Sequence, residues 1–231
     1  MGRPKVLGYS ERGMFNSIIF YLREHPEEIS GFLSTLDIKD TFFEDDVVCY
    51  TFLNEQSFSD FGDCDWTIIA EKDKKKQVIF IEGKVKTYSG NYNIDKEYSK
   101  IEKNKKNKEN KNYKGVSSNI FAQLYYKYLL TKLDGESVKG SLVGKSEKKI
   151  GKNPIVNKAY EKYIKDAAKF YYVAILPNEL SSENFSKKFT ALNLSMETKN
   201  IKCAYWGKIE EFFSKAEEVS KNFVYNKGQI Y

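Results

Sequence analysis

The chain has 231 residues, of which 41% are hydrophobic, 30% charged and 15% aromatic. This length and composition fit a folded globular protein and exclude a collagen-like or wholly disordered chain. The 38 basic residues outnumber the 32 acidic ones and give a net charge of +6. That modest excess has the sign that suits a polyanion such as nucleic acid, although a compositional bias of the genome toward lysine would produce it as well.

Several classes of protein are excluded by particular residues. No run of about 18 apolar residues exists, and the opening MGRPKVLGYSERG lacks the apolar centre of a secretory signal, so no membrane association is expected. Cys49, Cys64 and Cys203 are odd in number and form no CxxC pair, which favours a reducing, cytoplasmic location. The single histidine, His25, is expected at the surface, so any chemistry must come from carboxylates, lysines or tyrosines.

The first half of the chain predicts two helices and then three strands. Apolar residues at helical spacing predict a helix over 10–24, capped by Ser10, and a shorter helix over 27–36. β-Branched and aromatic residues predict three strands, over 47–53, 65–71 and 77–86. The second and third of these strands are expected to form a hairpin joined at KDKKK.

A polar segment rich in lysine and asparagine, 95–114, separates the hairpin from the next helix. Its low complexity predicts a solvated insertion, with a DNA-gripping arm as the alternative. A helix is expected to begin at a cap on Ser117 or Ser118 and to end before Gly135. A polar loop over about 135–155 follows.

The last third of the chain predicts a helix over 157–168, strands over 169–176 and 201–206, and a helix over 208–222. The resulting order, α-β-β-β-α-α-β-β-α, shows no repeat and no clear linker. We therefore expect one α/β domain over 1–231, with a central mixed β-sheet flanked by helices.

Chemically informative residues gather at one end of the predicted hairpin. The connection centres near residue 74, so antiparallel pairing puts Asp65 opposite residue 83, give or take one, beside Glu82 and Lys84. Alternation puts Glu82, Lys84 and Lys86 on one face of their strand. Charges at the end of a buried strand need partners, so two carboxylates and an ammonium could satisfy one another or hold a hard cation.

These residue types suit hydrolysis of a phosphodiester without a histidine. Two carboxylates supply oxygen ligands for Mg²⁺, which activates a bound water, and a nearby lysine can orient that water. Triplets of an acid, any residue and lysine recur in this lysine-rich chain. Only the triplet at Glu82 follows an apolar run, VIFI, and faces an aspartate that opens the preceding strand.

The segments GDCDWTII (62–69) and IEGKVKT (81–87) resemble the PD-(D/E)XK nuclease superfamily, which has the restriction-endonuclease-like fold. The resemblance implies that Asp65 and Glu82 bind Mg²⁺, with Mn²⁺ as a substitute, and that Lys84 is the catalytic lysine. It also implies a restriction-endonuclease-like core. Cys64 stands where the family has proline. Gly83 replaces a β-branched residue, which we interpret as letting the backbone approach the metal.

Four further residues are accessory candidates, each with a plain alternative. Glu11 matches the glutamate that many family members carry on the first helix, but acids are also favoured at helix N-termini. Asp63 could be a second ligand, or the first one if the register slips. Gln123 matches a helical glutamine of the family, although Lys127 stands at the family's tyrosine position and a solvated side chain is the alternative. Lys86 could contact phosphate or be solvated.

Together these residues predict a Mg²⁺-dependent endonuclease that acts on DNA, of restriction or defence type, with a structure-specific or repair nuclease also open. The resemblance implies a 3′ hydroxyl and a 5′ phosphate as product ends. A homodimer, and a partner methyltransferase for a restriction enzyme, are the further partners to expect. The alternative is a catalytically inactive nuclease-like domain that binds nucleic acid or protein.

Overall fold

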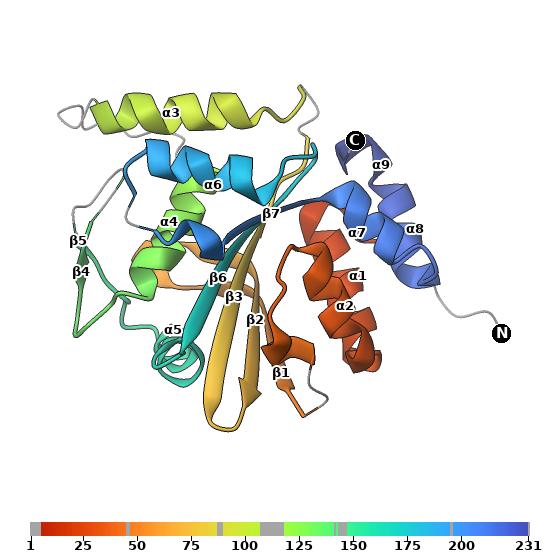
Figure 1. Cartoon of the computed structure of the whole chain (residues 1–231), viewed down its shortest axis with the longest axis horizontal. Coiled ribbons are helices and arrows are strands. Elements are labelled where there is room, and N and C mark those ends of the chain that lie inside the picture. Colours follow the sequence, from red (N-terminus) through yellow and green to blue (C-terminus); the bar gives the residue numbers. More distant parts are fainter. Residues whose placement is uncertain are drawn as a thin grey trace.

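A computed structural model describes residues 6–44, 47–86, 90–106, 118–140, 142, 147–194 and 196–230 (Figure 1). Its centre is a five-stranded sheet of order β1-β2-β3-β6-β7, with antiparallel pairing from β1 to β3 and parallel pairing from β3 to β7. The strands are β1 (Cys49–Ser57), β2 (Asp63–Lys72), β3 (Lys75–Gly83), β6 (Lys169–Leu176) and β7 (Ile201–Tyr205). The predicted α/β class with a mixed, helix-flanked sheet is confirmed.

Helices cover both faces of this sheet (Figure 1). One face carries α1 (Ser10–Glu24), α2 (Ile29–Thr35), α7 (Trp206–Phe212), α8 (Glu217–Tyr225) and α9 (Lys227–Ile230). The other face carries α3 (Ile94–Lys106), α4 (Ile120–Leu130), α5 (Pro154–Ala159) and α6 (Ser182–Ala191). A small hairpin of β4 (Val138–Lys139) and β5 (Glu147–Lys148) completes the secondary structure.

The sheet separates two apolar cores, and β3 contributes to both. Val78 and Phe80 join the core beneath α4, whereas Ile79 and Ile81 join the core beneath α1. This alternation along β3 agrees with the expectation, from the apolar run VIFI, that the strand is buried.

A two-residue turn sets the register of the β2–β3 hairpin. Lys72 pairs with Lys75, and the residues between them, Asp73 and Lys74, have φ of 49° and 62°. Positive φ at both central positions is typical of a type I′ turn, whose twist matches that of the flanking strands. The short turn fixes which residues meet at the far end of the hairpin.

The polar segment at 95–114 is not simply a solvated insertion, because its first part is helix α3. Ile94, Tyr98 and Ile101 recur at helical spacing, and Ile101 is buried. The Tyr98 ring packs edge-on against Phe121 of α4, with centroids 5.9 Å apart. Burial of this narrow apolar stripe stabilises a helix in a sequence dominated by lysine and asparagine. Residues 107–117 lie outside the described residues.

Two predicted helix caps are wrong. Ser10 has a φ of 65°, and its hydroxyl donates to the Glu11 carboxylate instead of accepting from the backbone of α1. The cap of α4 is Asn119, whose side chain accepts from the Phe121 N–H at 3.0 Å. Ser118 precedes that cap, and Ser117 lies outside the described residues. Asparagine is as good an N-cap as serine, so propensity alone does not decide between neighbours.

The remaining differences concern segments that the sequence pattern merged or missed. The loop expected at 135–155 contains β4 and β5, and the helix expected at 157–168 is α5 followed by one wide helical turn, Tyr160–Ile164. Helix α6 was not predicted, although Ser181 caps it and Phe185 and Phe189 are buried one turn apart. The last predicted helix divides into α7 and α8.

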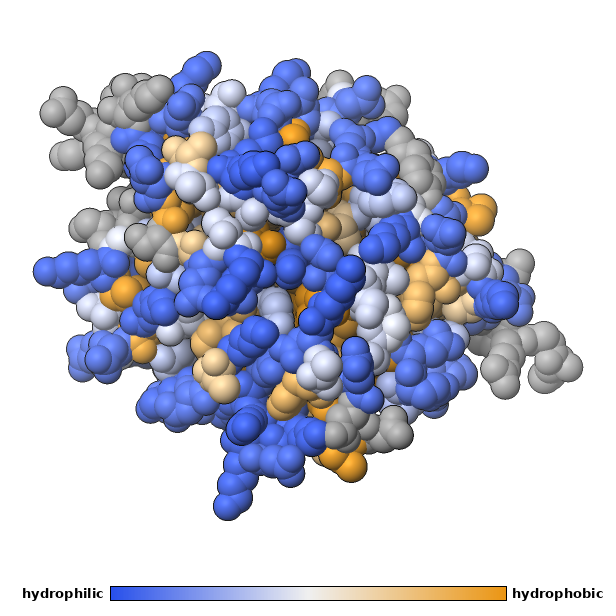
Figure 2. Space-filling view, viewed as in Figure 1, coloured by the Kyte–Doolittle hydropathy of each residue, from blue (hydrophilic) through white to orange (hydrophobic). Residues whose placement is uncertain are grey.

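No described helix is long and apolar enough to span a membrane. In Figure 2, hydrophilic side chains cover most of the face shown, and apolar residues appear between them in small areas.

Candidate metal centre

Asp65 and Glu82 lie next to each other where β2 begins and β3 ends. The ladder pairs Trp66 with Ile81, so the next position along sets Asp65 against Glu82, within the predicted range. The Asp65 carboxylate accepts a hydrogen bond of 2.8 Å from the backbone N–H of Gly83. This bond holds the carboxylate across the end of the neighbouring strand.

Lys127 of α4 supplies a positive charge directly beside Glu82. Its Nζ lies 3.2 Å from Glu82 Oε1, and both side chains are fully excluded from solvent. The same ammonium donates to the carbonyl oxygens of Phe61, at 3.0 Å, and Asp63, at 2.7 Å. Sequence reasoning gave Lys127 no role. The available signal was one charged residue inside the apolar run FAQLYYKYLL, because lysine is rarely buried without a partner.

Glu82 is a buried carboxyl with unmet hydrogen-bonding capacity. Neither of its oxygens has a donor in hydrogen-bond geometry among the described residues, so the Lys127 contact is an ion pair by distance. Burial raises the pKa of Glu82 to about 7; the Lys127 ammonium opposes this rise and the Asp65 carboxylate adds to it. Buried polar groups normally have partners, so this carboxylate fits a divalent cation, which would supply one.

Asp65 is half-buried and lies within the electrostatic reach of three charged side chains. Burial raises the pKa of Asp65, and the Gly83 N–H and the Lys84 ammonium lower it. The Glu11 carboxylate raises this pKa again, and the Lys127 ammonium lowers it. The influence of Glu11 puts the first turn of α1 beside the strand ends. Glu11 therefore lies near the candidate ligands while also being the acid of the first helical turn, so both of its predicted roles stay open.

Lys84 is the cation at this site without an ion pair among the described residues. It directly follows β3, where its backbone N–H bonds to the Ile175 carbonyl at 2.8 Å and its carbonyl accepts from Trp206 Nε1 at 2.8 Å. Its half-buried side chain acts on Asp65 and Glu82 through its charge. A fixed backbone with an uncommitted ammonium suits a group that meets substrate or water.

Gly83 is required by packing on the face away from Asp65. A Cβ at this position would lie 2.8 Å from Cε2 of Phe15 in α1 and 3.2 Å from Cζ2 of Trp206. Packing against α1 is therefore a further reason for glycine at this position, and approach of its backbone to a metal stays a prediction. The missing side chain lets α1 pack closely on β3, which also brings Glu11 close.

The other accessory candidates occupy different environments. The Asp63 side chain is exposed, and the residue meets Lys127 through its carbonyl oxygen. Gln123 lies one turn before Lys127 and is half-buried instead of solvated, with an Oε1 that has no partner among the described residues. Strand β3 ends before the predicted boundary at 86, and the Lys86 N–H bonds to the Gln229 carbonyl at 2.7 Å. The Lys86 side chain is half-buried.

The strand ends bring together two carboxylates, Asp65 and Glu82, and not, among the described residues, three ligand atoms already close enough to enclose a metal ion. Within the described chain, the group whose ligand atoms all lie within 4.8 Å of one another is His25, Glu27 and Glu28, after α1. Glu27 is exposed there, and Tyr21 already donates to Glu28 at 2.7 Å. This agrees with the expectation of an ordinary surface histidine. At the candidate centre, Asp65 and Glu82 are the residues that would hold a cation.

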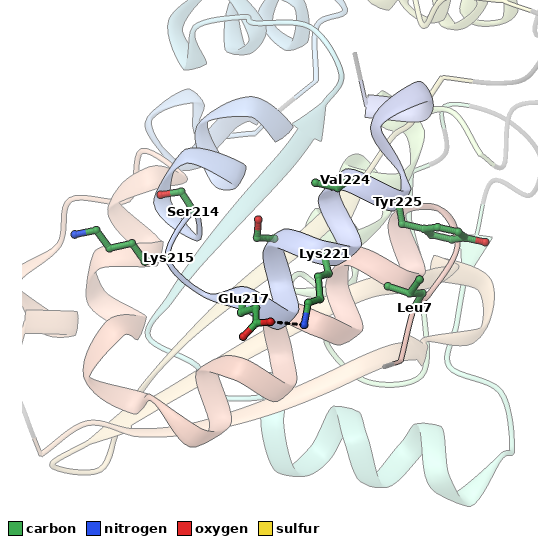
Figure 3. A pocket seen from close by; sticks show the side chains of 8 residues that line it. Leu7, Ser214, Lys215, Glu217, Lys221, Val224 and Tyr225 are labelled. Atoms are coloured by element: carbon green, nitrogen blue, oxygen red, sulfur yellow. Dashed lines mark ion pairs between the residues drawn. The ribbon is translucent and has the colours of Figure 1, made fainter. Parts of the chain in front are cut away.

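A pocket of about 490 Å³ lies on another part of the molecule, between the N-terminal segment and α8 (Figure 3). Its walls include an ion pair of 2.6 Å between Glu217 and Lys221, and exposed apolar side chains at Leu7, Val224 and Tyr225. The predicted site residues do not line it.

Comparisons of the chain with protein-family models, with curated proteins and with solved structures returned no match.

Proposed function

We propose that this protein is a Mg²⁺-dependent nuclease of the PD-(D/E)XK type that hydrolyses phosphodiester bonds in DNA. The observation that carries the proposal is the convergence of Asp65 and Glu82 from adjacent strands, with the unpaired Lys84 directly after them. The mixed sheet with helices on both faces is compatible with a restriction-endonuclease-like core, which we include in the proposal.

The residues would divide the chemistry as follows. Asp65 and Glu82 hold the cation through carboxylate oxygens, and Lys84 orients the attacking water and contacts the phosphate. Mg²⁺, when bound, lowers the pKa of a bound water and offsets the charge that develops on the phosphate. The water oxygen bonds to phosphorus as the bond to the 3′ oxygen breaks and that oxygen takes up a proton. The product ends are a 3′ hydroxyl and a 5′ phosphate.

DNA is the proposed substrate because the chain is basic and helix α3 adds exposed lysines. Lys96, Lys100 and Lys103 are exposed on α3, whereas Ile101 on the same helix is buried. One face of α3 therefore presents exposed lysines that a phosphate backbone could contact, which keeps the alternative of a DNA-contacting arm in the proposal. A homodimer could cut both strands, and a restriction enzyme would act beside a methyltransferase.

One observation favours the alternative, an inactive domain that binds nucleic acid or protein. Glu82 has no exposed surface and already faces the Lys127 ammonium, so a cation would have to reach a carboxylate that is buried in an ion pair. In such a domain the acids would be an internal ion-pair network, and DNA would bind without being cut.

A cleavage assay separates the two proposals. Supercoiled plasmid is incubated with Mg²⁺, with Mn²⁺ or with EDTA, using wild type and the variants Asp65→Asn, Glu82→Gln and Lys84→Met. Glu71→Gln and Lys75→Met are matched controls, because both residues are exposed at the far end of the same hairpin. Metal-dependent cleavage that is lost in the three site variants and kept in the controls supports the nuclease. DNA binding without cleavage under either metal supports the inactive domain.

A further inference from the structure

We propose that Lys127 is a positioning residue that holds Glu82 and the approach to Asp65 in a metal-ready arrangement, while Lys84 is the lysine that meets substrate. This inference rests on the proposed function. It gives a task to Lys127, to which the sequence assigned none, and separates that task from the task of Lys84.

The Lys127 ammonium is surrounded by protein groups. The side chain is fully buried, and three oxygen atoms surround Nζ: the carbonyls of Phe61 and Asp63 and Oε1 of Glu82. Two of the three ammonium donors bond to these carbonyls, and the charge faces the Glu82 carboxylate as an ion pair. Because the Lys127 side chain has no exposed surface, its ammonium does not face solvent, where a phosphate would approach.

The two carbonyl partners of Lys127, from Phe61 and Asp63, flank the turn that leads into β2. Gly62, between Phe61 and Asp63, has a φ of 76°, a conformation in which glycine is unstrained. Asp65 follows this turn by a few residues. One ammonium on α4 thus ties together the start of the strand that carries Asp65 and the end of the strand that carries Glu82.

A plain structural role is the competing explanation. A buried lysine can simply neutralise a buried glutamate and stabilise the fold. Lys148 provides the matched control, since it is also buried, donates to the Asp60 carbonyl in the same turn at 2.6 Å and packs 3.8 Å from the centre of the Tyr126 ring. The carbonyl that Lys148 bonds to belongs to Asp60, outside the strands that carry Asp65 and Glu82.

The test measures Mn²⁺ affinity by titration calorimetry on wild type, Lys127→Met, Lys148→Met and Lys84→Met, at a temperature where circular dichroism shows each to be folded. Partners that orient metal ligands are typically worth about 10- to 100-fold in metal affinity, so Lys127→Met should weaken binding by about that factor. Lys148→Met and Lys84→Met should bind within about twofold of wild type. Equal affinity in Lys127→Met, or an equal loss in Lys148→Met, would overturn the proposal.

Cleavage kinetics give a second readout that a structural role would not produce. Lys127→Met should need more Mn²⁺ for half-maximal cleavage and recover near wild-type kcat at saturating metal. Lys84→Met should lower kcat at every metal concentration. The reverse pattern would mean that Lys127 is the lysine that meets substrate.

A variant pair keeps the inference testable if Lys127→Met does not fold. The metal-free double variant Glu82→Gln/Lys127→Met lacks both charges, so it should melt at a higher temperature than Lys127→Met alone. If the loss of melting temperature in the double variant equals the sum of the losses in Glu82→Gln and Lys127→Met, the direct pairing is overturned. If wild type binds no Mn²⁺, or if Asp65→Asn does not weaken that binding, the proposed function itself fails. This outcome differs from a failure of the Lys127 proposal, in which wild type binds Mn²⁺ through Asp65 but Lys127→Met binds it equally well.

Discussion

The ring of Phe15 fills the space where a side chain at Gly83 would be, with the position of a Cβ only 2.8 Å from Phe15 Cε2. Phe15 is itself held by the Trp206 ring, whose centroid is 5.2 Å away. The contact joins α1 to the end of β3 at the residue between Glu82 and Lys84, so packing on one face of the sheet fixes the backbone that carries these two candidate residues.

Gly83→Ala should therefore be destabilising. Overpacking a core of this kind costs about 1–3 kcal/mol, because the displaced ring must leave its rotamer or move the helix. Urea unfolding measures the loss. The double variant Phe15→Leu/Gly83→Ala should lose less than the sum of the two single variants, since leucine frees space. Additive losses would show that the two residues do not compete for the same volume.

The free energy of unfolding of the metal-free protein should carry a pH-dependent contribution from Glu82. Burial raises the pKa of Glu82 from 4.5 to about 7, so the folded state binds the proton more tightly than the unfolded state does. This contribution is full below about pH 4.5 and is lost as pH rises to about 7, by up to about 3 kcal/mol.

Glu82→Gln cannot ionise, so its stability relative to wild type should increase across that pH window. Urea titrations in EDTA from about pH 4.5 to about pH 8 measure the difference. Glu71→Gln, on the exposed part of β2, should show no such trend. A flat difference for Glu82→Gln would mean that Glu82 ionises in the folded state as readily as in the unfolded one.

Asp40 should have a pH effect of the opposite sign. Burial raises the pKa of Asp40, but hydrogen bonds from the Lys169 ammonium, the Phe42 N–H and the Tyr171 hydroxyl lower it to about 2. The stabilisation is present above the ordinary value of 3.8 and is lost as pH falls toward 2.

Asp40→Asn should thus reduce stability at neutral pH by roughly 1–2 kcal/mol, after allowance for the exposure of Lys169, and by less near pH 3. Urea unfolding at both pH values tests this, with the exposed Asp166→Asn as the control. A penalty that is the same at both values would contradict an ionised, hydrogen-bonded Asp40.

Asn226 should be essential for the start of α1. Its buried amide accepts from the Ser10 N–H at 2.7 Å and donates to the Gly8 carbonyl at 2.9 Å. Asn226→Ala leaves these groups unpaired, which should cost about 2–3 kcal/mol. Hydrogen exchange should quicken in the first turn of α1, which carries Glu11. Asn184→Ala, exposed on α6, is the control. If hydrogen exchange in the first turn of α1 is unchanged, the Asn226 amide does not hold the helical turn that carries Glu11.

The sequence by itself placed Asp65 opposite residue 83, give or take one, and put Glu82 and Lys84 on one face of their strand; the structure sets Asp65 against Glu82. These features are local: a short turn sets the hairpin register, and strand side chains alternate with a period of two. Ionic groups after a strand that is apolar on both faces also indicated that partners must exist nearby. The α/β class followed from the order of the elements along the chain.

Only the tertiary structure decided which groups come to that strand end from elsewhere. Lys127 lies beside Glu82 because α4 packs on one face of the sheet. The Phe15 ring takes the space of a side chain at Gly83 because α1 packs on the opposite face. Both helices are far from β3 along the chain. Helix α3 forms because Ile101 is buried against its neighbours, although its composition is that of a solvated segment. Packing between distant segments depends on shape and burial, which periodicity and spacing along a single strand do not encode.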